Sequence, residues 1–107
     1  MSQHVFDTRY QGRPVTVIVG FDRPLRAFFC FVERNDDDEG DEYVYSNLED
    51  PKLATTMGMS KSLKHFEKRL ADLGITVPAS MFDQSEKDRL GNVGNRFVRH
   101  TADGTFA

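Results

Sequence analysis

The fold is decided by two stretches of sequence, Val15-Thr16-Val17-Ile18-Val19-Gly20-Phe21 and Arg26-Ala27-Phe28-Phe29-Cys30-Phe31-Val32-Glu33. The first stretch places β-branched residues at every second position, which predicts a strand with one face against a core. The second stretch is apolar on both faces and predicts a covered central strand. Asp22-Arg23-Pro24 separates the two stretches and predicts a turn.

Two further strands extend this pair. Residues 5–10 precede Gln11-Gly12-Arg13-Pro14, a glycine-containing turn that suits a hairpin. Residues 42–45 resume as a strand after a polar loop over residues 35–41. Because each connection is too short for a parallel crossover, we expect an antiparallel four-stranded meander.

The apolar spacing changes from strand-like to helical in the second half of the chain. Ser60 is a plausible N-cap for a helix over 60–73, whose apolar stripe is Met59, Leu63, Phe66, Leu70 and Leu73. A shorter helix is expected over 78–90, ended by Gly91. Residues 96–100 form either a fifth strand or an extended tail, and residues 101–107 are expected to fray. The sequence therefore predicts one α+β domain over residues 1–107, with both helices packed on one face of the sheet.

Composition and charge limit the classes of protein. The chain has 107 residues, one cysteine and a net charge of −3. A single cysteine excludes an intrachain disulfide framework, and the longest apolar run, residues 27–32, is far too short to span a membrane. We therefore expect a cytoplasmic protein that does not bind membranes. Residues 36–50 hold eight acidic residues and no basic residue, so the rest of the chain carries 14 basic and 9 acidic residues, a charge of +5.

The acidic loop is the first candidate site, and its residues are Asp36, Asp37, Asp38, Glu39 and Asp41. Asn35, Asp37, Glu39 and Gly40 match early positions of a calcium-binding loop, but the twelfth position is Ser46 and the flanks are strands. The match fails on both counts, so no metal site is predicted, although carboxylates this dense can hold a divalent ion weakly. Two interpretations remain open: a solvated loop that discourages edge aggregation, or an acidic patch that docks on a basic partner.

The first predicted helix carries a second candidate site. Lys61, Lys64 and Lys68 form a basic stripe opposite the apolar one, as a phosphate-binding surface would. Glu67 and Asp72 interrupt that surface, and no known nucleic-acid-binding signature accompanies it. The alternative is an ordinary solvated face.

The turn between the two deciding strands is the third candidate. It places Phe21, Arg23 and Arg26 beside Pro24, a combination that can anchor a partner protein, although solvated arginines on a plain connection are the simpler interpretation. The Phe28/Cys30/Val32 face is expected to be core; its alternative is a contact with a partner or a second copy, in a homodimer.

Catalytic chemistry finds little support in the sequence. His4, His65 and His100 are far apart and form no metal-binding spacing, and Cys30 stands in the most apolar part of the chain. No nucleophile elbow, phosphate loop or dinucleotide fingerprint is present. We therefore predict neither an enzyme nor a cofactor.

Four segments resemble short uncharacterised proteobacterial proteins of unassigned function: Gly20-Phe21-Asp22-Arg23-Pro24-Leu25, Tyr45-Ser46-Asn47-Leu48, Leu73-Gly74-Ile75-Thr76-Val77-Pro78 and Asn92-Val93-Gly94-Asn95. The resemblance implies a bacterial origin and carries over no activity, cofactor or site residue. We expect a non-catalytic protein-interaction module of the bacterial cytoplasm; the alternative is a small nucleic-acid-associated protein that uses the basic face of the first helix.

Overall fold

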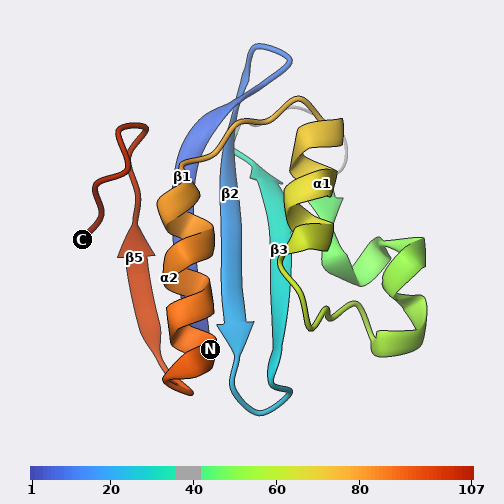
Figure 1. The fold of residues 1–107 in the computed structure, drawn as a ribbon. Coiled ribbons are helices and arrows are strands. Elements are labelled where there is room, and N and C mark those ends of the chain that lie inside the picture. Colours follow the sequence, from blue (N-terminus) through green and yellow to red (C-terminus); the bar gives the residue numbers. More distant parts are fainter. Residues whose placement is uncertain (36–41) are drawn as a thin grey trace.

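The computed structural model describes residues 1–35 and 42–107, which form a five-stranded sheet with two α-helices on one face (Figure 1). The strands are β1 (Ser2–Tyr10), β2 (Arg13–Asp22), β3 (Ala27–Arg34), β4 (Tyr43–Ser46) and β5 (Arg96–Arg99). Their order across the sheet is β4-β3-β2-β1-β5. The predicted antiparallel meander of β1 to β4 is confirmed, and residues 96–99 form the fifth strand, which lies parallel to β1.

The helices are α1 (Lys64–Asp72) and α2 (Ala79–Leu90), preceded by two short 3₁₀ helices, η1 (Asn47–Glu49) and η2 (Pro51–Thr56). The helix expected from Ser60 begins four residues later. Ser60 exchanges two backbone hydrogen bonds with Phe28 at 2.7 and 3.1 Å, which hold the chain extended beside β3. Ser62 Oγ instead accepts a hydrogen bond from Lys64 N at the start of α1. The predicted N-cap was therefore wrong because a long-range strand contact occupies that residue.

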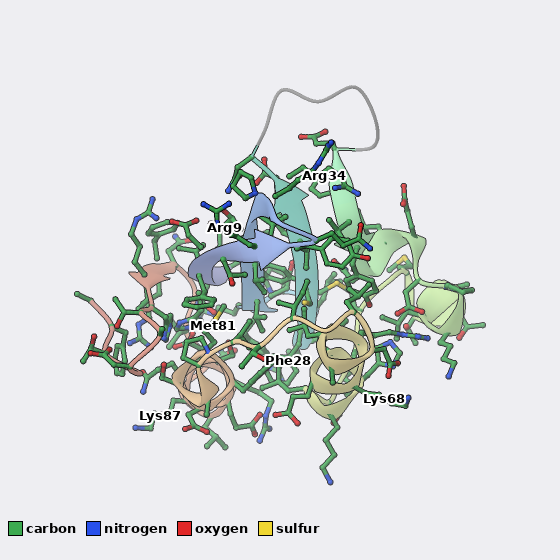
Figure 2. The ribbon with its side chains drawn as sticks, turned by 90° about the horizontal axis from the view of Figure 1, so that it is seen from above. Arg9, Phe28, Arg34, Lys68, Met81 and Lys87 are labelled. Atoms are coloured by element: carbon green, nitrogen blue, oxygen red, sulfur yellow. The ribbon has the colours of Figure 1, made fainter. Side chains whose placement is uncertain are left out.

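The main core lies between the sheet and the two α-helices. Register brings Val17 beside Val32 and Val19 beside Cys30, so their side chains share the helix-facing side of the sheet. Phe66 from α1 and Met81 from α2 are fully buried against this face. Phe28 and Met81 lie between sheet and helices, whereas Lys68 and Lys87 extend away from the sheet (Figure 2). The Phe28/Cys30/Val32 face is therefore core, as expected.

A smaller apolar cluster occupies the opposite face of the sheet. Val5, Ile18 and Phe29 are buried there, and Met59 packs against them. The ring of Phe29 lies over Gly20: a Cβ placed on that glycine would be 2.5 Å from Phe29 Cζ and 2.0 Å from Ser2 O. This second cluster explains why β3 is apolar on both faces.

The last residues fold back on β5. Arg99 and Ala107 exchange two backbone hydrogen bonds of 3.1 Å, and the rings of His100 and Phe106 lie 5.3 Å apart. Residues 101–107, for which a frayed tail was expected, therefore pair with the strand that precedes them. Among the described helices, none combines the length and the apolar character that crossing a membrane requires.

Candidate functional site

The β2–β3 turn and the C-terminal end of α2 lie at the same end of the sheet (Figure 1). Residues from both of these segments line a basic cleft. It has a volume of about 410 Å³ and is lined by Phe21, Arg26, Lys61, Arg89 and Asn92. These residues come from three separate parts of the chain. The cleft unites two candidate sites that the sequence treated separately: the turn at 21–26 and the lysine at position 61.

The β2–β3 turn supplies the first wall. Asp22 Oδ1 accepts a hydrogen bond from Leu25 N at 3.1 Å, and Arg26 N donates to Arg23 O at 3.2 Å. The turn closes with Arg26 in a left-handed conformation, at φ +51°. A non-glycine residue pays a steric penalty there, and such conformations concentrate at functional sites.

Lys61 supplies the second wall. Its Nζ donates to Leu25 O at 3.2 Å and to Arg26 O at 3.0 Å, which fixes the ammonium group beside the turn. Lys61 thus precedes α1 and does not continue the stripe of Lys64 and Lys68. The predicted basic stripe is divided between two places in the structure.

The end of α2 supplies the third wall, through Arg89 and Asn92. Asn92 is also left-handed, at φ +50°. The amides of Gly91, Asn92 and Val93 all donate to carbonyls of the last helical turn. This segment is therefore a helix cap, with those three amides unavailable to bind an anion, and the turn interpretation of residues 91–95 holds.

Positive charge dominates the cleft. Arg89 is paired with Glu86, but the guanidinium group of Arg26 has no hydrogen bond or ion pair to any described residue. The guanidinium group of Arg23 likewise has no polar partner within the described part of the chain, and it lies against Gly94, 3.0 Å from where a Cβ would stand. Because guanidinium groups bind carboxylate and phosphate oxygens through paired donors, the cleft is suited to a compact anionic group.

The other predicted site residues lie elsewhere. Phe21 is only 1% exposed and its ring packs edge-on against Phe28, so it forms the floor of the cleft and is no exposed anchor. Lys68 pairs with Asp72 on the outer face of α1 at 3.3 Å. The acidic candidates Asp36, Asp37, Asp38, Glu39 and Asp41 lie outside the described residues.

A buried polar chain under α2 was not predicted. Asp88 Oδ2 accepts from His4 Nε2 at 2.6 Å, His4 Nδ1 lies 2.9 Å from His100 Nε2, and His100 Nδ1 lies 2.8 Å from Ser80 Oγ. Arg96 donates to the other oxygen of Asp88 at 2.8 Å. Since an ionised carboxylate only accepts, each group in the chain donates toward Asp88, beginning with the hydroxyl of Ser80. No sequence signal predicted this contact, because His4 and His100 are 96 positions apart.

The pKa values in this buried polar chain favour a structural role for its side chains. Burial, together with the neighbouring His4 and Arg96, lowers the pKa of His100 to about 4. Burial also lowers the pKa of His4, against the opposing effect of Asp88. A base with so low a pKa takes up protons poorly at neutral pH, and neither Ser80 nor His100 lines the basic cleft. This buried polar chain therefore links α2 to β1 and to His100, the residue after β5.

A second buried carboxylate, Asp50, connects the 3₁₀ helices to α1. Asp50 Oδ2 accepts from Tyr45 at 2.6 Å and His65 at 2.8 Å, and lies 3.3 Å from Arg69 Nε. Burial alone would raise the pKa of Asp50, but these hydrogen bonds lower it to about 2. A cavity of about 340 Å³ lies beside the cluster, but every oxygen of the carboxylate already has a partner.

Neither a metal centre nor a reactive thiol stands out. Within residues 1–35 and 42–107, no three His, Cys, Asp or Glu side chains are grouped so that they can hold a metal ion. Cys30 is fully buried, and burial raises the pKa of its thiol, so the residue is inert as expected.

Searches of protein-family models, curated proteins and solved structures found no match to this chain.

Proposed function

We propose that this protein is a non-catalytic interaction module of the bacterial cytoplasm, which binds a partner protein through acidic side chains held in the basic cleft. The observation that carries the proposal is the convergence of Arg26, Lys61 and Arg89 on one cavity, with Arg23 beside it. Three distant segments bring these cations together, although like charges repel at short range. An anionic group in the cleft would relieve that repulsion.

Several features favour an acidic protein segment over nucleic acid. Among the described residues, Phe21 is the one aromatic residue that lines the cleft, and it is buried, so its ring offers no platform for stacking bases. Lys64 and Lys68 lie outside the cleft, and the same helix carries two acids, Glu67 and Asp72, of which Asp72 pairs with Lys68. An extended phosphate backbone needs a continuous cationic track, whereas a short acidic segment needs only one compact cluster.

Direct binding of labelled probes tests the proposal. The first probe is a fluorescein-labelled peptide of alternating Glu and Ser, followed by fluorescence anisotropy, and the second is a single-stranded oligonucleotide. Arg26→Gln is the test variant because the Arg26 guanidinium has no described partner to lose. Lys68→Gln, on the outer face of α1, is the matched control.

We expect Arg26→Gln to weaken peptide binding about tenfold, the loss of one charge-assisted hydrogen bond, and Lys68→Gln to leave it unchanged. Equal peptide affinity in the wild type and in Arg26→Gln would refute the proposal. Tighter binding of the oligonucleotide, weakened by Lys64→Gln and Lys68→Gln, would establish the nucleic-acid alternative instead.

A further inference from the structure

An apolar groove lies on the side of the sheet that α1 and α2 leave open. It has a volume of about 360 Å³, and its lining includes Met1, Leu25, Phe29, Phe31, Leu48 and Met57. Eight large apolar side chains are exposed in the described part of the chain, and five of them line this groove. Exposed apolar side chains scattered singly are ordinary, but a cluster of this kind marks an interaction surface.

The groove is continuous with the basic cleft. Another cavity, of about 320 Å³, lies between them, and its lining includes Leu25, Met57, Met59 and Lys61. It shares Lys61 with the basic cleft and the other three residues with the apolar groove. One surface therefore runs from the cations at Arg26 to the apolar side chains at Leu48.

The walls of the groove suit large apolar side chains of variable shape. Met57 and Met59 are flexible, polarisable side chains, which adapt to irregular partners. Phe29 and Phe31 form a rigid floor, with ring centroids 6.2 Å apart. Adaptable walls over an aromatic floor are typical of surfaces that accept a peptide.

We infer that the occupant of this surface is one segment of a partner protein that carries acidic residues followed by large apolar residues such as Leu and Phe. The acids bind in the basic cleft, and the apolar side chains fill the groove. This inference rests on the proposed function, because the cleft supplies its charge complementarity. It adds that the partner segment also carries large apolar residues, which bind in the groove.

Three synthetic peptides distinguish binding in the basic cleft from binding in the apolar groove. The full peptide carries an acidic block followed by alternating Leu and Phe; the acid-only peptide replaces the apolar residues by Ser, and the apolar-only peptide replaces the acids by Ser. The test variant is Leu48→Ser/Met57→Asn. These side chains are 75% and 72% exposed, and Asn tolerates the left-handed backbone of Met57 at φ +56°. Leu90→Ser, 71% exposed on α2 and outside the groove, is the control.

We expect the full peptide to bind at least tenfold more tightly than the acid-only peptide. The Leu48→Ser/Met57→Asn variant should bind the full peptide only as tightly as the acid-only one, while Leu90→Ser retains the difference. Equal binding of the full and acid-only peptides, in all three proteins, would overturn this inference and leave the proposed function standing. If neither the full peptide nor the acid-only peptide binds, both this inference and the proposed function are refuted.

Two further outcomes would also overturn the inference. If the apolar-only peptide binds as tightly as the full peptide, the cleft contributes nothing to recognition by the groove. If sedimentation shows a dimer that Leu48→Ser/Met57→Asn dissociates, the groove is the contact between two copies of this chain. A monomer at the concentrations used for binding is the supporting result.

Discussion

Gly20 is the residue whose replacement the sheet should tolerate least. A Cβ at this position would overlap Ser2 O, a backbone atom with no freedom to move, and the ring of Phe29. We expect Gly20→Ala to lower the free energy of unfolding by at least about 3 kcal/mol, the upper end of overpacking costs. Gly91→Ala is the control, because its Cβ would meet only ordinary contacts at 3.4 and 3.6 Å. Urea denaturation of both variants checks the prediction, and similar losses would contradict it.

His100 should make stability depend on pH. Its pKa is about 6.5 in the unfolded chain and about 4 in the fold, so the unfolded state binds more protons between these values. The stability that His100 contributes is therefore fully present above pH 6.5 and is lost as the pH falls toward 4. Between pH 7 and pH 5 we expect a loss of about 2 kcal/mol from this residue.

The variant His100→Gln isolates that effect. It removes the titrating ring, so urea denaturation at pH 7 and pH 5 should show a smaller loss on acidification than in the wild type. An identical loss in both proteins would show that His100 remains exposed to protons in the fold. Ser80→Ala serves as the control, because it removes the hydroxyl partner of His100 and leaves the imidazole in place.

At the scale of elements, Asp50 holds the segment between β4 and α1. Removing this carboxylate leaves Tyr45, His65 and Arg69 without a shared acceptor. We expect Asp50→Ala to destabilise the fold by at least about 2 kcal/mol, less than the roughly 3–5 kcal/mol of fully buried pairs because Arg69 and His65 are partly exposed. Asp72→Ala, which breaks an exposed pair with Lys68, should cost under about 1 kcal/mol. Thermal unfolding distinguishes the two, and equal shifts would contradict the prediction.

Sequence patterns predicted the strands well because their signal is local. Alternation at Val15, Val17 and Val19 reports a buried face, and short turns require neighbouring strands to run antiparallel. The start of α1 was mispredicted because Ser60 is held by Phe28, a contact between residues 32 positions apart. The 3₁₀ helices at 47–56 carry capping residues, Ser46 and Asp50, but no apolar period long enough to reveal them.

The candidate site was predictable only in pieces. Arg23, Arg26 and Lys61 were recognised individually as surface cations, and the turn chemistry at Pro24 was evident. Their convergence with Arg89 depends on the packing of α2 against the sheet, which no local pattern reports. The His4–His100 contact could not be predicted from the sequence for the same reason.

At the scale of the whole molecule, the cations of the basic cleft lie outside the apolar core. The basic cleft lies at the Ala27 end of β3, while Asn35 and Glu42 lie at its Arg34 end. The core between them is apolar. Binding and stability should therefore respond differently to ionic strength.

Raising the salt concentration from low to near-molar should weaken binding of the acidic peptide about tenfold or more, because exposed charges are screened beyond a few ångströms. The free energy of unfolding should change little over the same range. Anisotropy titrations and urea denaturation in matched buffers measure the two quantities. Salt-independent peptide binding would show that the groove, and not the cations, supplies the affinity.

The pairing of β5 with β1 has a consequence for the order in which the protein is built. Ser2 lies beside Arg96 and Val5 beside Arg99, so β1 cannot pair along this edge until β5, 94 positions later, has been synthesised. Until then β1 presents an open edge, which invites pairing with other chains. The β1 edge of the sheet is therefore covered only after β5 has been synthesised, and covering it requires contacts between residues 94 positions apart.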